Sequence, residues 1–188
     1  EDVYFKFRKS QVVGNDTERA GIIHVSDVNS SCLRKVMYDK TTVRPSMDTE
    51  SFRPLWMGQA LHGFSKIGLD EFHELTMAYD FVKDEAVNLE EMKKIPLTDK
   101  RWYDIIIGTC DDVIKREEGY IVVDKKTTGS ISYFSRYGKM SDSHKTQLDL
   151  YRLLLKKCKN IDAEWGTIVY IGTKTEAGKK DAPVVVTS

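Results

Sequence analysis

The sequence predicts an α/β fold, in which a mixed central β-sheet is flanked by helices. Runs of apolar residues typical of buried strands cover residues 103–107, 120–123 and 165–171. Apolar residues at helical spacing cover residues 56–69 and 141–157, which predicts two amphipathic helices. Strands and helices that alternate along a chain are typical of a sheet with helices packed against it.

Each expected element has its own sequence signals. Ser26 or Asp27 is expected to cap a first helix that ends near Lys40. A loop with two prolines then leads to the helix at 56–69. The other expected elements, in chain order, are a strand pair or a strand with an extension within 78–89, a turn at 96–100, a strand at 103–107 covered on both faces, strands at 113–114 and 120–123, the helix at 141–157, the strand at 165–171 and a last strand at 184–187.

Length and charge favour a single domain and limit the kinds of partner. The 188 residues suit one domain with a substantial core. The 29 basic residues equal the 29 acidic residues in number, so a nucleic acid would have to be bound through local basic patches. The patches are Arg34–Lys35, Lys93–Lys94, residues 136–139 and residues 156–159. No apolar run approaches the roughly 20 residues of a membrane span, so no membrane partner is expected.

Two short segments place acidic and basic side chains on neighbouring strands. The segment Gly-Thr-Cys-Asp ends at Asp111, and the segment Val-Val-Asp-Lys-Lys ends at Lys126. Successive side chains of a strand point to opposite faces, so Asp124 and Lys126 share a face and Lys125 points away. Asp111 joins them if the two strands pair through a turn at 117–119. Two carboxylates and an ammonium group on one face suit a divalent metal ion and a phosphate.

Four motifs in chain order resemble those of the PD-(D/E)XK nuclease superfamily, and in particular its RecB-like branch, which includes CRISPR-associated exonucleases. The motifs are Gly58-x-x-x-His62, Gly108-x-x-Asp111, Asp124-x-Lys126-Thr127 and Gln147-x-x-x-Tyr151. They span residues 58–151, and the segment 26–38 also resembles the N-terminal helix of the family. The resemblance implies a single nuclease domain over residues 1–188, with its core at about 24–172 and a restriction-endonuclease-like sheet.

The resemblance also implies a role for each motif residue in the hydrolysis of a phosphodiester. Asp111 and Asp124 are expected to bind the metal through carboxylate oxygens. Lys125 is expected to bind it through its backbone carbonyl, and His62 from the neighbouring helix. Lys126 is expected to orient or deprotonate the attacking water, or to steady the phosphate. The expected metal is Mg²⁺ or Mn²⁺, with Mn²⁺ at least as effective because imidazole suits it better.

Three parts of the chain are expected to contact DNA. Gln147 and Tyr151, four residues apart on one helix face, are expected to contact a phosphate or a base and to hold Lys126 in place. Arg34 and Lys35 are expected to contact the DNA backbone. The segment 131–140 mixes aromatic and basic residues. It can either stack on bases or pack a short helix on the domain.

Some neighbouring residues compete for these roles or have a structural interpretation. Asp112 competes with Asp111 for the metal, but it would point to the opposite face of the strand. The remaining histidines, His24, His73 and His144, are expected to be structural.

Cysteine usage distinguishes this chain from relatives that carry an iron–sulfur cluster. Many CRISPR-associated members hold such a cluster with four cysteines, one near the N-terminal helix and three near the C-terminus. This chain has Cys32, Cys110 and Cys158, with no C-terminal group of three. A cluster usually needs four thiolates, so none is expected in this chain. We expect all three cysteines to be small buried residues in a reducing compartment.

The sequence therefore predicts a metal-dependent deoxyribonuclease, most directly an exonuclease that acts on DNA ends in recombination, repair, viral DNA processing or CRISPR adaptation. The expected ends are single-stranded or duplex, and single-stranded ends are favoured. The expected location of the enzyme is the cytoplasm or the compartment that holds DNA. Besides DNA ends, the partners considered are a helicase or recombination protein and further copies of the chain. Two alternatives stay open: a structure-specific endonuclease with the same site, and a nucleic-acid-binding module without catalysis. The intact set of motif residues favours catalysis, because degenerate members of the family usually lose one of them.

Overall fold

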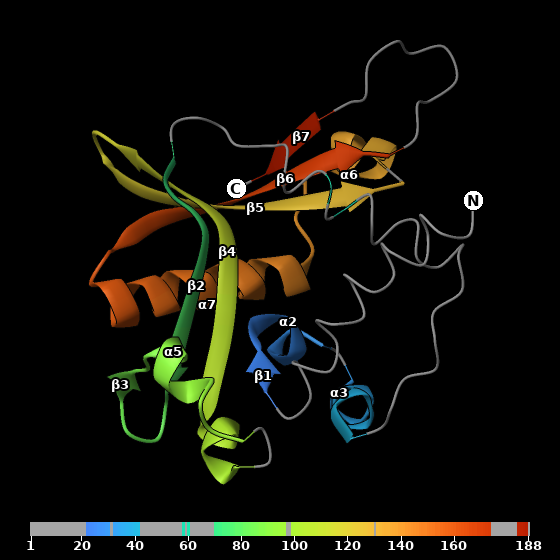
Figure 1. Ribbon diagram of the computed structural model, residues 1–188. Helices are drawn as coiled ribbons and strands as arrows, with labels where there is room; N and C mark the ends of the chain where they lie inside the picture. The colour runs from blue at the N-terminus through green and yellow to red at the C-terminus, as the bar shows by residue number, and fades with distance from the viewer. Residues whose placement is uncertain are drawn as a thin grey trace, which may run out of the picture.

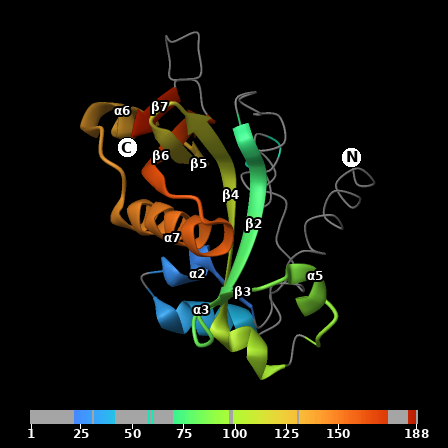
Figure 2. The same cartoon turned by 90° about the vertical axis from the view of Figure 1, so that its left-hand side faces the viewer.

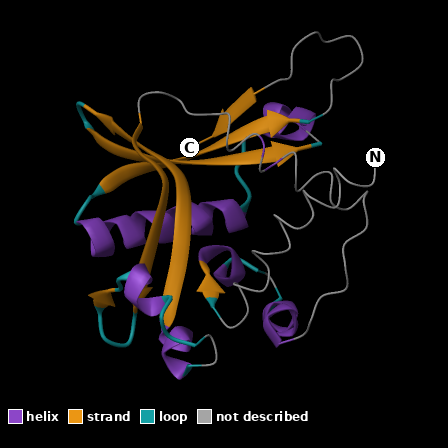
Figure 3. Cartoon of the chain, in the orientation of Figure 1, coloured by secondary structure: helices purple, strands orange, loops and turns teal. Residues whose placement is uncertain are grey.

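The computed structural model describes residues 22–30, 32–41, 58, 60, 70–96, 99–129, 131–173 and 184–187. In this part of the chain, a seven-stranded mixed sheet has the order β3-β2-β4-β5-β6-β7, and β1 pairs with β4 off this path (Figures 1 and 3). The predicted α/β class, with a mixed central sheet and flanking helices, is confirmed. None of the helices described is both long and apolar enough to cross a membrane.

Strands and helices follow one another along the chain with the following bounds. The strands are β1 (Ile23–His24), β2 (Asp70–Asp80), β3 (Glu85–Ala86), β4 (Ile105–Arg116), β5 (Gly119–Thr128), β6 (Ala163–Gly172) and β7 (Val184–Thr187). The helices are α2 (Val25–Val28), α3 (Leu33–Thr41), α5 (Leu89–Met92), the 3₁₀ helix η1 (Lys100–Asp104), α6 (Ile131–Tyr137) and α7 (Asp142–Lys159). The β1–β4 and β5–β6 pairs are parallel, and the other pairs are antiparallel.

Helix α7 covers one face of the sheet, as Figure 2 shows beside β2 and β4. Its buried stripe contains the four residues predicted from helical spacing, namely Leu148, Tyr151, Leu154 and Leu155. The Oγ atom of Ser141 caps the helix by accepting a hydrogen bond from the backbone N–H of His144 at 3.3 Å. Asn160 ends the helix in the left-handed conformation that is common at this position.

Two glycines let helices approach the sheet closely. A Cβ atom on Gly108 of β4 would lie 2.7 Å from Val25 Cγ2 and 2.8 Å from Leu154 Cδ1. A Cβ atom on Gly166 of β6 would lie 2.9 Å from Leu148 Cβ. Real Cβ atoms do not approach other atoms so closely, so both positions require glycine for this packing. The motif glycine at position 108 therefore has a packing function beneath α2 and α7.

The opposite face of the sheet carries a second, smaller core under α5 and η1 (Figure 2). Its buried members are Ile22, Ala78, Met92, Trp102, Ile105 and Ile107. Between two of these residues on β4, Ile106 packs against the core under α7. The start of β4 is thus covered on both faces, as predicted, although residues 100–104 form a 3₁₀ helix and the strand begins only at Ile105.

The first predicted helix is interrupted, which corrects the expectation of one helix from Ser26 or Asp27 to about Lys40. It forms two helices, α2 and α3, and His24 occupies the N-cap of α2. Asp27 instead accepts a hydrogen bond from the backbone N–H of His24 at 2.8 Å. Between the helices, Ser30 Oγ accepts a hydrogen bond from the backbone N–H of Cys32. A serine side chain competes with helical hydrogen bonds in this way, which explains the break.

A strand pair within 78–89 is confirmed, because residues 79–80 of β2 pair with residues 85–86 of β3. Strand β2 starts earlier than expected, which is a second correction. It begins at Asp70, and only the two-residue β3 and the short α5 follow it before residue 92. Glu74 lies in its middle with φ +49°, a left-handed conformation that is rare for a residue with a side chain. This residue interrupts the alternation of apolar and polar residues from which a strand is predicted. The expected helix at 56–69 lies largely outside the described residues. Within this range only Gly58 and Ala60 are described, and both are helical.

Candidate functional site

The two motif strands, β4 and β5, pair for only part of their length. A turn at Glu117–Glu118 joins them, and their ladder ends where Asp112 faces Val123. Beyond this pair, β4 continues beside β2 and β5 continues beside β6 (Figure 1). Asp111 and Asp124 come next in the same register. The two acidic motif residues therefore lie where the strands separate.

The carboxylates of Asp111 and Asp124 are buried and face the same helix. They are 8% and 2% exposed, respectively. Oδ2 of Asp111 accepts a hydrogen bond from the backbone N–H of Lys125 at 2.5 Å. Oδ2 of Asp124 lies 2.8 Å from Nζ of Lys126. Burial, the charge of Asp124 and the charge of Asp111 all raise the pKa of Tyr151 on α7. The structure thus brings together the three residues predicted to share a face.

Gln147 connects α7 to this cluster. Its Nε2 atom donates hydrogen bonds to Asp124 Oδ1 at 3.3 Å and to Tyr151 Oη at 2.8 Å. Both α7 side chains are buried. The sequence predicted that this pair would hold Lys126. In the structure Gln147 instead holds Asp124, and Asp124 in turn pairs with Lys126. The pair therefore acts on the predicted catalytic lysine through one intervening carboxylate.

The beginning of the first motif lies beside the strand that carries Lys126. A Cβ atom on Gly58 would lie 3.6 Å from Thr127 Oγ1, in ordinary contact. His62, the predicted metal ligand of this motif, lies outside the described residues. Within the described residues, no group of three or more His, Cys, Asp or Glu side chains is arranged to hold a metal. The two described carboxylates, Asp111 and Asp124, supply oxygen donors of the kind that Mg²⁺ and Mn²⁺ prefer.

A buried ion-pair cluster occupies the opposite face of β4 and β5. Asp112, which is fully buried, forms an ion pair with Nζ of Lys125. Its other oxygen lies 2.7 Å from Nδ1 of His73 on β2. Asp112 therefore does point away from Asp111, as predicted. The alternation of side chains along a strand correctly placed Lys125 on that face. The pairing of Lys125 with Asp112 was not predicted, because the two residues lie on different strands and neither strand's sequence indicates the partner.

A histidine that was expected to be structural, His144, lies close to Lys126. His144 is in the first turn of α7, and its Nδ1 atom lies 2.6 Å from the hydroxyl of Tyr170. Tyr170 is the β6 neighbour of Lys126 in the parallel ladder. Burial and the positive charge of Lys126 lower the pKa of His144. The spacing of three residues from Gln147 was the sequence signal that could have placed His144 on this face of the helix.

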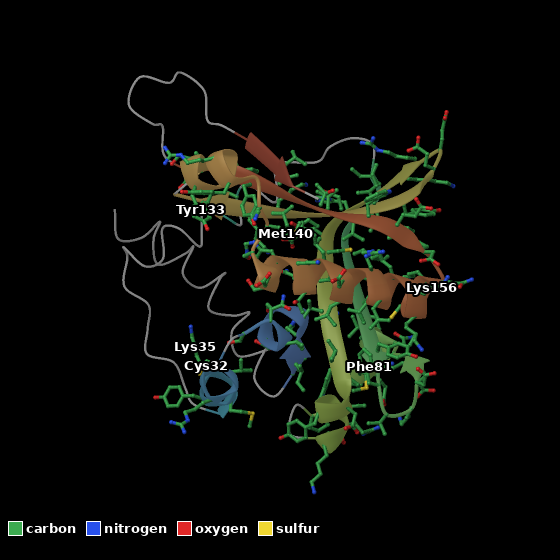
Figure 4. The ribbon with its side chains drawn as sticks, turned by 180° about the vertical axis from the view of Figure 1, so that it is seen from behind. Cys32, Lys35, Phe81, Tyr133, Met140 and Lys156 are labelled. Carbon is green, nitrogen blue, oxygen red and sulfur yellow. The ribbon has the colours of Figure 1, made fainter. Side chains whose placement is uncertain are left out.

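The predicted DNA contacts from the N-terminal helix are not part of this cluster. Arg34 and Lys35 are exposed on α3, and Figure 4 shows Lys35 on a helix that lies away from α6 and α7. In the part of the chain that the structure describes, neither side chain has an acidic partner within ion-pair distance. They remain available as positive charges on a separate surface.

The three cysteines differ in environment, and one corrects the prediction that all are buried. Cys110 is fully buried, its Sγ donates to Leu75 O at 3.7 Å, and burial raises the pKa of its thiol to about 12. Cys158 is half-buried, and burial raises its pKa as well. Cys32 is exposed, because it lies in the polar break between α2 and α3.

Comparisons with known proteins give a likeness in fold. No protein-family model matches the sequence, and no curated protein matches it. The crystal structure of SSO0001 matches this chain with a TM-score of 0.52 and 19% sequence identity. The match covers 98% of this chain and 78% of that chain. At this level of identity, the likeness supports the α/β architecture and nothing about activity.

Proposed function

We propose that this chain is a metal-dependent deoxyribonuclease of the PD-(D/E)XK superfamily, in its RecB-like branch, and that it acts as an exonuclease on DNA ends. The observation that carries the proposal is the meeting of Asp111, Asp124 and Lys126 on one face of the sheet, where β4 and β5 separate. Two carboxylates and an ammonium group on rigid strands are the groups that phosphodiester hydrolysis needs.

Each residue of the cluster has a role in this proposal. Asp111 and Asp124 hold the divalent cation through their carboxylate oxygens, with His62 as a further ligand. When bound, the cation supplies acidification of a water molecule and electrostatic stabilisation of the transition state. Lys126, whose side chain is 30% exposed beside Asp124, orients the water or neutralises a phosphate oxygen. The lysine is thus partly open to solvent, whereas the carboxylates are buried.

The backbone of Lys125 connects the two acidic residues. Its N–H donates to Asp111, and its side chain is anchored to Asp112 on the opposite face. Because the side chain of Lys125 is turned away, its backbone carbonyl oxygen is the atom proposed as a ligand of the metal. Gln147 restrains Asp124 from α7. Rigid support of this kind matters because misplacement of catalytic groups by about 1 Å can lower a rate by roughly 100-fold.

The proposal is tested by incubation with circular single-stranded DNA and with the same DNA after linearisation. An exonuclease with Mn²⁺ or Mg²⁺ degrades only the linear form, and EDTA stops the reaction. Degradation of the circular form would replace the exonuclease with a structure-specific endonuclease that uses the same site. Binding of DNA without cleavage, in the presence of either metal, would contradict a nuclease and favour a binding module.

A further inference from the structure

The short helix α6, which follows β5 and precedes α7 in the chain, carries an exposed pair of aromatic rings. Tyr133 and Tyr137 are 58% and 56% exposed. Their ring centroids are 4.9 Å apart with an interplanar angle of 51°, so each ring restrains the other. Ile131 is 2% exposed and anchors the helix to the main core. Ile131 thus contributes to the packing of α6, and the two tyrosines present much of their surface to solvent.

Positive charge accompanies the two rings. Residues 129–140 contain Arg136 and Lys139 and no acidic residue, although the whole chain has no net charge. Both basic side chains are exposed, and neither has an acidic partner within ion-pair distance among the residues described. In two other basic patches, by contrast, lysines are paired with acids: Lys93 with Glu90, Lys156 with Asp162 and Lys157 with Asp84.

The chain connects α6 to the proposed site at both ends. Before the helix, β5 carries Lys126, and Tyr133 follows it by seven positions, which limits the distance between their Cα atoms to roughly 25 Å. After the helix, α7 begins with the turn that carries His144, near Lys126. Figure 4 shows Tyr133 and Met140 toward one end of α7, with Lys156 at the other end.

We infer that Tyr133 and Tyr137 form a stacking platform for the bases of a single-stranded nucleic acid, and that Arg136 and Lys139 contact its phosphates. Exposed aromatic rings with interleaved basic residues are the usual means of binding single strands without sequence preference. A duplex offers few base faces to such rings because its bases are stacked on one another. The inference rests on the proposed function, and it identifies the strand that leads to the site as single.

Binding without cleavage tests the platform separately from catalysis. Anisotropy of a fluorescein-labelled oligothymidine is measured in EDTA with the wild-type chain, with Tyr133→Ala/Tyr137→Ala and with Tyr133→Phe/Tyr137→Phe. We expect the alanine pair to raise the Kd by about 5-fold or more per stacked base and the phenylalanine pair to leave it within about twofold. The matched control is Tyr103→Ala on η1, also 58% exposed, which should leave the Kd unchanged. Circular dichroism of each variant confirms that it is folded.

The proposed charge contacts have their own readout. For Arg136→Ala/Lys139→Ala, the slope of log K against log salt concentration should become smaller by about 1.4, the value for two single-strand phosphate contacts. The control Lys156→Ala removes a lysine that is already paired with Asp162, and should leave the slope unchanged. An unchanged slope in the double variant would contradict these contacts.

A photo-crosslink identifies the stacked residues directly. An oligonucleotide with 5-iododeoxyuridine is irradiated in the complex, and the adduct is located by mass spectrometry. Adducts on Tyr133 or Tyr137 support the platform, and adducts confined to Tyr103 or Trp165, another exposed aromatic residue, overturn it. Equal affinity of the wild-type and alanine-pair proteins overturns it too, even if the wild type cleaves DNA. Tyrosine-dependent binding without any cleavage supports the platform and contradicts the nuclease.

Discussion

Asp124 is the residue through which helix and sheet meet at the candidate site. One of its oxygens accepts a hydrogen bond from Gln147, and the other pairs with Lys126. Gln147 in turn donates to the buried hydroxyl of Tyr151. Removal of the Tyr151 hydroxyl should therefore affect Asp124 and Lys126 through Gln147.

The hydroxyl of Tyr151 tests this connection. In Tyr151→Phe, the amide of Gln147 loses one acceptor, so the free energy of unfolding should fall by about 0.5–1.5 kcal/mol in urea titrations. We expect the cleavage rate to fall about tenfold, because Gln147 is no longer held toward Asp124. Tyr79→Phe is the matched control, since Tyr79 is also buried and its hydroxyl bonds to Asp84. An equal loss of cleavage in both variants would argue against the connection.

Thiol reactivity follows from the different surroundings of the cysteines. At pH 8, exposed Cys32 should react with an alkylating reagent within minutes, and buried Cys110, with a pKa of about 12, should react only on unfolding. Peptide mass spectrometry of the native protein measures both rates. Rapid labelling of Cys110 would mean that the strand around Gly108-x-x-Asp111 opens under native conditions.

At the scale of secondary structure, two glycines of the motifs have different packing. Gly108→Ala would push a methyl group against Val25 and Leu154, and we expect it to destabilise the fold by about 1–3 kcal/mol. Among the described residues, a methyl group in Gly58→Ala meets only Thr127 Oγ1 at 3.6 Å, and position 58 lies in a helix, where alanine is favoured. This substitution should leave stability unchanged or raise it. Thermal unfolding compares the two, and equal destabilisation would contradict the packing described for α2 and α7.

The ion pair between Asp112 and Lys125 joins β4 and β5 at the end of their ladder, where Asp112 faces Val123 and Lys125 follows two residues later. Asp112→Asn or Lys125→Met alone removes one member of a buried ion pair and should cost about 3–5 kcal/mol. The double variant should lose much less than the sum. A double-mutant cycle in urea measures this coupling, with the exposed Lys93–Glu90 pair as the weakly coupled control. Additive losses at Asp112 and Lys125 would show that the pair does not act as a unit.

The elements that could be predicted are those whose pattern is local. The buried stripe of α7 follows from helical spacing, and the shared face of Asp124 and Lys126 follows from strand alternation. Strand β2 could not be predicted in full, because Glu74 adopts a left-handed conformation and interrupts the alternation. The pairing of Asp112 with Lys125 and His73 depends on three strands in register, which no single segment encodes.

At the scale of the whole molecule, the sheet changes its partners across the site. Strands β2 and β4 form one part of it, and β5 continues with β6 and β7 after it leaves β4 (Figure 1). This separation places the carboxylates of Asp111 and Asp124 just beyond the end of the β4–β5 ladder, where Gln147 of α7 contacts Asp124. The four motifs indicated which residues to expect there, but not that α7 would hold Asp124 directly or that Arg34 and Lys35 would lie apart from the cluster.

The most direct test of the central proposal is cleavage of end-labelled linear single-stranded DNA with Mn²⁺ by the wild type, Lys126→Ala and Lys115→Ala. Lys115 is an exposed lysine on the same hairpin and serves as the control. We expect wild-type and Lys115→Ala protein to release the label at equal rates, EDTA to stop the release, and Lys126→Ala to be slower by about 100-fold or more. Equal rates for folded Lys126→Ala and wild-type protein would contradict the assignment of the site.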